Sequence, residues 1–170
     1  MDDRLDSEFY SRDVLYVAPA LLGMKLIRCY PAGEKEIFII SETEAYKGTE
    51  DLACHASKGL TARNRIMFER GGHLYLYLIY GMYWMMNVVT GGRDVPQAVL
   101  IRGLKEIYGP GRVTRRLQID GSFNGEDLLT SRKIWIEKGI KKTQITAGPR
   151  IGIDYAGEFW KNVPWRFYLK

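Results

Sequence analysis

The segment from His73 to Thr90 constrains the fold more than any other part of this sequence. Its first half, HLYLYLIY, alternates leucine and tyrosine, and a period of two is the pattern of a β-strand with two different faces. Gly81 follows, and glycine readily takes the positive φ that a tight chain reversal needs. The second half, WMMNVVT, is rich in β-forming residues. The segment therefore predicts a β-hairpin.

The predicted tip of this hairpin carries Tyr80 and Met82. Exposed apolar groups at such a site are unfavourable in water unless they are buried or meet a partner. We therefore expect the two side chains either to pack into the core or to contact a binding partner. The pattern itself favours neither.

A second β-pattern precedes the hairpin. Side chains alternate across an extended strand, so Glu42, Glu44 and Tyr46 share one face. Counting backwards places Phe38 and Ile40 on that face too. A stripe that passes from apolar residues to two acids and a tyrosine suits a strand whose end enters a cleft. From the pattern alone, a strand end in water is the more common situation for such acids, because most carboxylates are exposed.

The remaining chain predicts short strands and few helices. Ser11 can cap a helix over Asp13–Leu22, which Gly23 would end, and a second helix, Arg112–Leu117, follows a Gly-Pro-Gly sequence. Strands are expected at Lys25–Tyr30, Glu36–Ser41, Gln97–Gly103, Ile134–Glu137, Thr143–Ile153 and Pro164–Leu169. The 170 residues contain no repeat, linker or low-complexity segment, which predicts one domain.

Basic side chains form two groups. The formal net charge of +5 and the pI of about 9.2 weakly favour a polyanionic partner. One group follows the Glu-rich segment and the other lies on the predicted second helix: Arg63, Arg65, Arg70, Arg112, Arg115 and Arg116. The last three share one helix face. Each group is compatible with phosphate contacts and with an ordinary solvated surface.

Arg102 and His55 are further candidates for chemistry. Arg102 lies on a predicted buried strand, where a charge is unfavourable unless it is paired. Glu44 is an available partner, although the guanidinium could instead reach water at the strand end. His55 lies in a polar loop, and a lone histidine of this kind is more often exposed or structural than functional.

The two cysteines, Cys29 and Cys54, provide no disulfide framework, and together with two histidines they make a zinc site improbable. The acidic N-terminus and the short apolar run Val14–Met24, which contains Pro19, fit neither a signal peptide nor a membrane span. We expect a soluble intracellular protein without a metal.

Five motifs occur in an order that resembles the 3-methyladenine DNA glycosylase family, of the single-domain alkyladenine type. They are ETEAY (42–46), ARNRIMF (62–68), HLYLYLIYGMYWMMN (73–87), AVLIRGL (98–104) and GPGRVTRRLQID (109–120). The resemblance extends from about Asp13 to the closing RFYL, so it covers nearly the whole chain.

This resemblance implies a role for each matching residue. Glu44 would activate the attacking water, and Arg102 would help to position it. Tyr46 and Tyr77 would sandwich a flipped base, His55 would contact its edge, and Asn87 would disfavour guanine by crowding its amino group. Tyr80 would insert into the minor groove with Met82 beside it. The residues predicted to contact the DNA backbone are Arg63, Arg65, Arg112 and Arg115.

The chain departs from the family pattern at two places. The loop from His55 to Arg63 is shorter than in vertebrate members, and Ala62 stands where some members carry proline. The choice of Glu44 over Glu42 as catalyst rests on the motif, because both lie on one face. The family is monofunctional and uses no cofactor, and we expect no lyase activity, although Lys47 could supply the amine that one requires.

Three other functions fit parts of the pattern. A non-catalytic nucleic-acid-binding module would use only the aromatic hairpin and the arginines. A helix–hairpin–helix glycosylase would use Gly109-Pro110-Gly111 with Asp127 as its acid, but it would need helical flanks. A nucleoside hydrolase would not need Tyr80 as a wedge.

We predict a single α+β domain over residues 1–170, with a curved, mostly antiparallel sheet, flanking helices and a protruding hairpin that inserts into DNA. We expect a monomer that acts on damaged purines in double-stranded DNA, located with the DNA and away from membranes.

Overall fold

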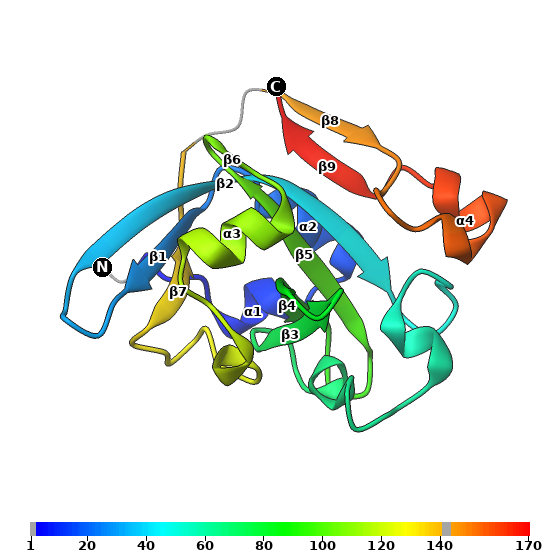
Figure 1. Cartoon of the computed structure of the whole chain (residues 1–170), viewed down its shortest axis with the longest axis horizontal. Coiled ribbons are helices and arrows are strands. Elements are labelled where there is room, and N and C mark those ends of the chain that lie inside the picture. The colour runs from blue at the N-terminus through cyan, green and yellow to red at the C-terminus, as the bar shows by residue number, and fades with distance from the viewer. Residues whose placement is uncertain (1–2, 141–143) are drawn as a thin grey trace.

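The central element of the computed structural model, which describes residues 3–140 and 144–170, is the long strand β2 (Lys35–Lys47). Its first part pairs with β1 (Lys25–Cys29) and its second part with β5 (Gln97–Leu104), both antiparallel. Residues 42–44 also pair with β9 (Arg166–Leu169). β2 therefore curves through the molecule and connects both ends of the sheet (Figure 1).

Nine antiparallel strands form this sheet in the described residues, with the order β3-β4-β5-β2-β1-β7 along its main path. β6 pairs with β5, and β8 pairs with β9. The strands not yet placed are β3 (Leu74–Ile79), β4 (Tyr83–Thr90), β6 (Ile107–Tyr108), β7 (Ile134–Glu137) and β8 (Ile145–Gly148). The predicted α+β fold with a mainly antiparallel sheet is confirmed.

Short helices flank the sheet: α1 (Ser7–Tyr10), α2 (Val14–Ala20), α3 (Pro110–Arg116) and α4 (Glu158–Asn162). α3 packs against β4 and β5 on the face toward the viewer in Figure 1, and α1 and α2 lie behind the sheet. The single-turn helices are η1 (His55–Lys58), η2 (Arg65–Phe68), η3 (Gly121–Phe123) and η4 (Asp154–Ala156). None of the helices in the described part of the chain has the length and apolar content needed to cross a membrane.

The start of α2 corrects one sequence prediction. Its N-cap is Asp13, whose carboxylate accepts a hydrogen bond from the Leu15 backbone N–H at 2.8 Å. Ser11 instead ends the preceding helix α1, which the sequence analysis did not predict. An aspartate oxygen caps as well as a serine hydroxyl does, so the pattern alone could not choose between them.

Strand limits in the C-terminal part also differ from the prediction. The strand expected over Thr143–Ile153 is β8, which covers Ile145–Gly148, and Thr143 lies outside the described residues. Helix α4 was not predicted. β9 forms inside the predicted strand Pro164–Leu169 and begins at Arg166.

The simple alternation assumed for β2 is interrupted. The register with β5 shifts between Ile40 and Thr43, as at a β-bulge. Ile40 is buried in the same core cluster as Ala45, a residue of opposite parity. Glu42 lies between two register shifts, and Glu44 and Tyr46 follow both, so counting back to Ile40 does not place it on their face.

The predicted hairpin forms from β3 and β4, with Ile79 opposite Tyr83. The Met82 N–H donates to the Ile79 carbonyl oxygen at 3.1 Å, which closes the turn. Both central residues have positive φ, 54° at Tyr80 and 65° at Gly81. Gly81 takes this conformation readily, whereas a tyrosine there is strained. Tyr80 is 84% exposed, so its side chain does not pack into the core.

Candidate active site

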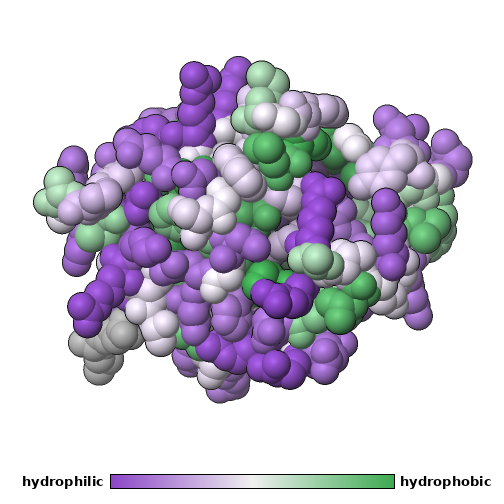
Figure 2. All heavy atoms as spheres, turned by 60° about the horizontal axis from the view of Figure 1, so that its bottom comes forward, coloured by the Kyte–Doolittle hydropathy of each residue, from purple (hydrophilic) through white to green (hydrophobic). Residues whose placement is uncertain are grey.

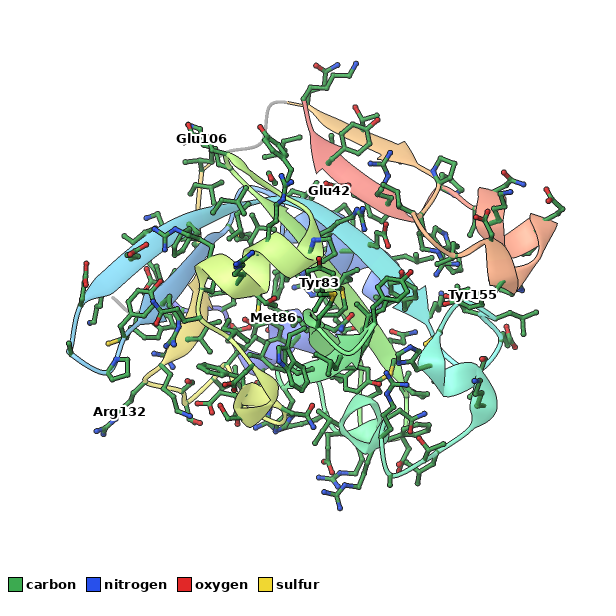
Figure 3. All side chains as sticks on the ribbon, viewed as in Figure 1. Glu42, Tyr83, Met86, Glu106, Arg132 and Tyr155 are labelled. Atoms are coloured by element: carbon green, nitrogen blue, oxygen red, sulfur yellow. The ribbon has the colours of Figure 1, made fainter. Side chains whose placement is uncertain are left out.

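A cavity of about 730 Å³ lies beside the hairpin. We call it the cleft. Its walls come from the end of β2, the loop and η1 that follow it, the hairpin, β5, the start of α3, and residues 151–155. Side chains from these separate segments meet there, among them Tyr46, His55, Tyr77, Asn87, Arg102 and Tyr155. Figure 3 shows Tyr83 close to α3, and Tyr155 near the loop after β2.

The surface of this molecule carries no continuous apolar face on the side shown in Figure 2, where apolar side chains form separate patches among polar ones. Several large exposed apolar side chains belong to the cleft and the hairpin: Leu52, Tyr80, Met82, Tyr83, Ile151 and Tyr155. Of these, all except Met82 line the cleft. The cleft therefore has an apolar rim.

Glu44 lies beneath the cleft and has no exposed surface. One carboxylate oxygen accepts a hydrogen bond from the Tyr46 hydroxyl at 2.8 Å, and the other accepts from the Ile151 backbone N–H at 2.9 Å. Burial raises the pKa of Glu44 above its usual value, although these two donors and the charge of Arg102 oppose the rise. Such a carboxylate accepts a proton more readily than an exposed one.

Arg102 lines the cleft and is bound to two carboxylates. Its Nε atom is 3.2 Å from Glu42 and 3.6 Å from Glu44. Glu42 also accepts a hydrogen bond from Arg166 at 3.0 Å. The expected pairing of Arg102 with Glu44 is therefore present, but Glu42 is the nearer partner and is shared between two arginines.

Tyr77 and His55 form an aromatic wall of the cleft, with ring centroids 4.4 Å apart. The Nδ1 atom of His55 and the hydroxyl of Tyr75 are hydrogen-bonded at 2.8 Å. Burial, together with the charges of Arg63 and Lys58, lowers the pKa of His55 to about 4. The imidazole is therefore neutral at pH 7, and its other nitrogen remains available for a ligand.

Tyr46 and Asn87 complete the inner surface of the cleft. Asn87 is buried, and its amide nitrogen donates to the carbonyl oxygens of Tyr75 and Met85 at 3.2 and 3.4 Å. These bonds fix the amide plane. The structure thus gathers every predicted base-pocket residue in one cavity.

The four arginines predicted to contact the DNA backbone divide into two groups. Arg63 and Arg112 line the cleft, whereas Arg65 and Arg115 are exposed outside it. Arg112 and Arg115 form no ion pair within the described residues. Arg116, on the same helix, forms a salt bridge with Glu36 at 2.6 Å, so this arginine has a partner within the protein.

Several residues of the site were not identified from the sequence. Tyr75 orients His55, the Ile151 N–H binds Glu44, and Tyr155 adds a further aromatic side chain that donates to the Ala53 carbonyl oxygen at 3.0 Å. The alternation HLYLYLIY already placed Tyr75 beside Tyr77. A backbone N–H carries no sequence signal, so Ile151 could not have been found.

The loop after β2 leads into the single turn η1, which covers His55–Lys58. The Asp51 carboxylate accepts from the backbone N–H groups of Lys47 and Ala53, both at 3.0 Å, and so holds the preceding chain in a turn.

Within residues 3–140 and 144–170, no three His, Cys, Asp or Glu side chains are grouped so that they could hold a metal ion. Both cysteines are free thiols. Burial raises the pKa of the Cys54 thiol to about 12, so it is unreactive at neutral pH.

Comparison with known proteins gives a consistent result. The family model described as Methylpurine-DNA glycosylase (MPG) matches residues 8–109 and 105–170. A protein of Methanocella arvoryzae is 45% identical over 186 residues, covering 98% of this chain and 92% of its own. Proteins of Legionella pneumophila strain Corby (45% over 176 residues; 98% and 94%) and Natranaerobius thermophilus (38% over 191 residues; 98% and 96%) are also similar. All three are named "Putative 3-methyladenine DNA glycosylase".

Proposed function

The chain belongs to the methylpurine-DNA glycosylase family, and on this premise we propose that it excises alkylated purines, chiefly 3-methyladenine, from duplex DNA. The observation that carries the proposal is the buried carboxylate of Glu44 beneath an aromatic cleft of about 730 Å³. The cleft is large enough for a purine. The carboxylate supplies the group that hydrolysis of its glycosidic bond requires.

Hydrolysis breaks the bond between C1′ of the deoxyribose and the purine nitrogen. The bonding electrons leave with the base, and C1′ acquires positive charge. Water then attacks C1′ and gives its proton to Glu44, whose negative charge also stabilises the cationic sugar. The products are the free base and an abasic site.

One carboxylate is sufficient for this substrate. Enzymes that cleave O-glycosides need a second carboxyl group to protonate the leaving oxygen. An alkylated purine is already cationic and leaves without added protonation. Glu42, which lies between Arg102 and Arg166, therefore needs no acid role, and it holds Arg102 near Glu44 and the attacking water.

The base must leave the helical stack to reach Glu44, at a cost of a few kcal/mol. Stacking on aromatic rings recovers about 1–3 kcal/mol per base. Tyr46 and Tyr77 provide these rings, and neutral His55 contacts the edge of the base. Asn87, held by the Tyr75 and Met85 carbonyl oxygens, crowds the position of the guanine amino group and so disfavours normal guanine.

The hairpin tip keeps the base extruded. Tyr80 and Met82 are 84% and 65% exposed, and an apolar side chain inserted between base steps fills the vacated space. Arg63, Arg65, Arg112 and Arg115 contact the phosphates, which makes binding by this monomer dependent on salt.

We further propose that the enzyme is monofunctional. A lyase step needs an amine close to C1′. The Lys47 ammonium group lies 3.1 Å from the Asp13 carboxylate, and Lys47 does not line the cleft. It is therefore held away from the sugar.

The test measures release of free base from alkylated duplex DNA, together with DNA binding. We expect release by the wild type, a loss of about 10²–10⁴-fold in Glu44→Gln, and unchanged binding by that variant. Glu42→Gln is the matched control, since it alters a neighbouring carboxylate on the same strand, and it should retain more activity.

Binding without release in the wild type would instead indicate a non-catalytic DNA-binding module. Greater loss in Glu42→Gln than in Glu44→Gln would exchange the roles of the two acids.

A further inference from the structure

A fully buried ion pair between Asp51 and Arg150 lies behind the cleft. The two guanidinium Nη atoms contact the two carboxylate oxygens at 2.6 and 2.9 Å, and neither side chain is exposed. A buried ion pair is unfavourable unless further hydrogen bonds satisfy both groups. Here each carboxylate oxygen also accepts a backbone N–H, from Lys47 or Ala53. The geometry is that of a bidentate, rigid pair.

This ion pair joins the segments that carry the proposed catalytic groups. Arg150 donates to the carbonyl oxygen of Ala45 at 2.9 Å, and Ala45 lies between Glu44 and Tyr46 in β2. Arg150 also directly precedes Ile151, whose N–H binds Glu44.

The partner carboxylate holds a further segment of the site. Asp51 binds the N–H of Ala53, two residues before His55. Both the strand end and the loop to the histidine are therefore fastened to the same pair of charges.

Arg150 also contacts the aromatic platform. Its Cζ atom is 4.9 Å from the ring centroid of Tyr46 and 5.2 Å from that of Trp165. Tyr46 lines the cleft, whereas Arg150 is buried and does not. The guanidinium therefore packs over the tyrosine ring from within the protein rather than from the cleft.

We propose that Arg150 is a positioning residue that fixes Glu44 and Tyr46, and that Asp51 neutralises the charge behind Tyr46 so that a cationic base can stack on its other side. The inference rests on the proposed glycosylase function. An aromatic face attracts a cation through its negative quadrupole. An uncompensated guanidinium on one face of the ring opposes a cation on the other, and the Asp51 carboxylate removes that conflict.

The charge of Asp51 distinguishes this role from simple structural support. Loss of structural support slows excision of every base alike. Loss of the Asp51 charge penalises a cationic lesion, such as 7-methylguanine, more than a neutral one, such as hypoxanthine. The ratio of the two excision rates is therefore the informative quantity.

The experiment measures single-turnover release of 7-methylguanine and hypoxanthine from duplex DNA, with DNA affinity and thermal unfolding, for the wild type, Arg150→Lys and Asp51→Asn. Arg150→Lys keeps the charge but loses the bidentate geometry, and we expect it to slow both reactions roughly 10–100-fold with little change in affinity. Asp51→Asn should lower the rate ratio of cationic to neutral lesion by about tenfold.

Arg28→Lys is the matched control. Arg28 is a second buried arginine, it donates to backbone carbonyl oxygens, and it does not line the cleft. Arg28→Lys should alter thermal unfolding without altering the excision rate of either lesion. If Asp51→Asn fails to fold, the double variant Asp51→Asn with Arg150→Gln restores neutrality, and we expect a wild-type rate ratio at reduced rates.

Two outcomes overturn the inference. In one, Arg150→Lys behaves like Arg28→Lys. In the other, Asp51→Asn slows the excision of both lesions equally, or the neutral double variant changes the rate ratio of cationic to neutral lesion. Release of neither base by the wild type would refute the proposed function itself, so the two failures are distinguishable.

Discussion

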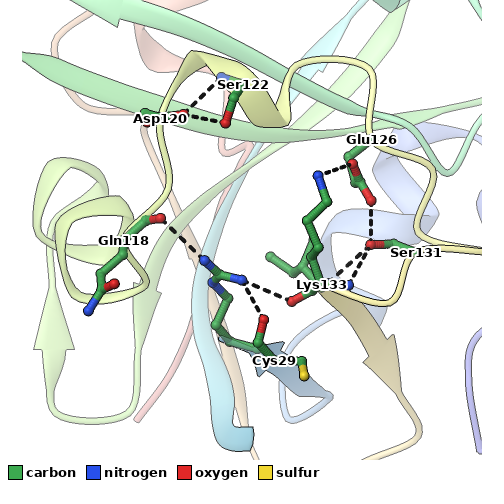
Figure 4. A network of polar contacts seen from close by, with 9 residues as sticks. Cys29, Gln118, Asp120, Ser122, Glu126, Ser131 and Lys133 are labelled. Atoms are coloured by element: carbon green, nitrogen blue, oxygen red, sulfur yellow. Dashed lines mark hydrogen bonds and ion pairs between the residues drawn. The ribbon is translucent and has the colours of Figure 1, made fainter. Parts of the chain in front are cut away.

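Two buried polar clusters lie toward opposite ends of β2, and they differ in what their charges face. The first surrounds Arg28 on β1, a residue paired with Glu36 of β2. The Arg28 guanidinium donates to backbone carbonyl oxygens of Cys29, Leu117, Gln118 and Lys133 at 2.7–3.4 Å. Figure 4 shows the acceptors on Cys29, Gln118 and Lys133. Its Cζ atom also lies 4.7 Å from the Tyr30 ring and 4.9 Å from the Phe123 ring.

The second cluster contains Arg150, Asp51 and Glu44, near the other end of β2. Arg150 is likewise held by carbonyl oxygens, of Ala45 and Trp160, and by two aromatic rings. It differs in having a carboxylate partner, and a second buried carboxylate, Glu44, lies directly under a cavity.

The comparison teaches that a buried arginine alone does not indicate a functional site. Both arginines connect segments distant in sequence through similar contacts. Only the second cluster includes a carboxylate with a raised pKa beside a cleft. A raised pKa in a cleft is the feature that typifies catalytic acids and bases.

Glu44→Gln should separate activity from stability most strongly. Base release falls by about 10²–10⁴-fold. Because burial raises the pKa of Glu44, the folded state binds its proton more readily than the unfolded state. The resulting stabilisation is present at acid pH and is lost as pH rises through the raised pKa.

Denaturant unfolding at several pH values tests this sign. At neutral pH the Gln variant should be at least as stable as the wild type, and the wild type should gain relative stability as the pH falls. The raised pKa of Glu44 is contradicted if Glu44→Gln loses more stability, compared with the wild type, at neutral pH than at acid pH.

Arg28→Met should show the opposite pattern. It leaves several buried carbonyl oxygens without their donor, and we expect a loss of about 1–3 kcal/mol in the free energy of unfolding. The excision rate per folded molecule should not change, since none of the residues that contact Arg28 lines the cleft. Denaturant unfolding and single-turnover kinetics on the same preparation measure both quantities. A slowed reaction in fully folded protein would show that the clusters are coupled.

His55→Gln should change how stability depends on pH. The pKa of His55 is lowered to about 4 in the folded protein, against about 6.5 in an unfolded chain. The unfolded state therefore binds the proton first, and stability is lost as the pH falls from about 6.5 toward 4. The variant should lose less stability over that interval than the wild type. If thermal unfolding shows the same dependence of stability on pH for the variant and the wild type, the His55 imidazole lies in a more polar environment.

Tyr80→Gly should have the smallest effect on stability, and we expect it to raise the free energy of unfolding. Tyr80 has φ of 54°, and glycine removes a strain of about 1–2 kcal/mol for a residue in this region. Part of that gain is offset by the greater freedom of glycine in the unfolded chain. The variant should be slightly more stable and yet excise bases more slowly, while Tyr80→Phe keeps the wild-type rate. A destabilised glycine variant would mean that the tip packs more tightly than its exposure indicates.

The sequence predicted the elements whose signal is local. The alternation from His73 to Tyr80, with Gly81 after it, was enough to predict the hairpin. The segment ETEAY placed Glu42, Glu44 and Tyr46 on one face. This part of the prediction survives the register shifts, since Arg102 contacts both glutamates and the Tyr46 hydroxyl bonds Glu44. Predictions failed where neighbouring residues offered equivalent signals, as for Ser11 and Asp13 at the start of α2.

The sequence alone determined the β-hairpin, the strand that carries Glu44, and, through its ordered motifs, the family. Only the tertiary structure decided which groups surround Glu44. The Ile151 N–H that binds it is 107 positions away in sequence, and Arg150 is 99 positions from Asp51. Local patterns report backbone conformation and the face of a side chain. The pKa of Glu44 depends instead on desolvation and donors that come together only when distant segments pack.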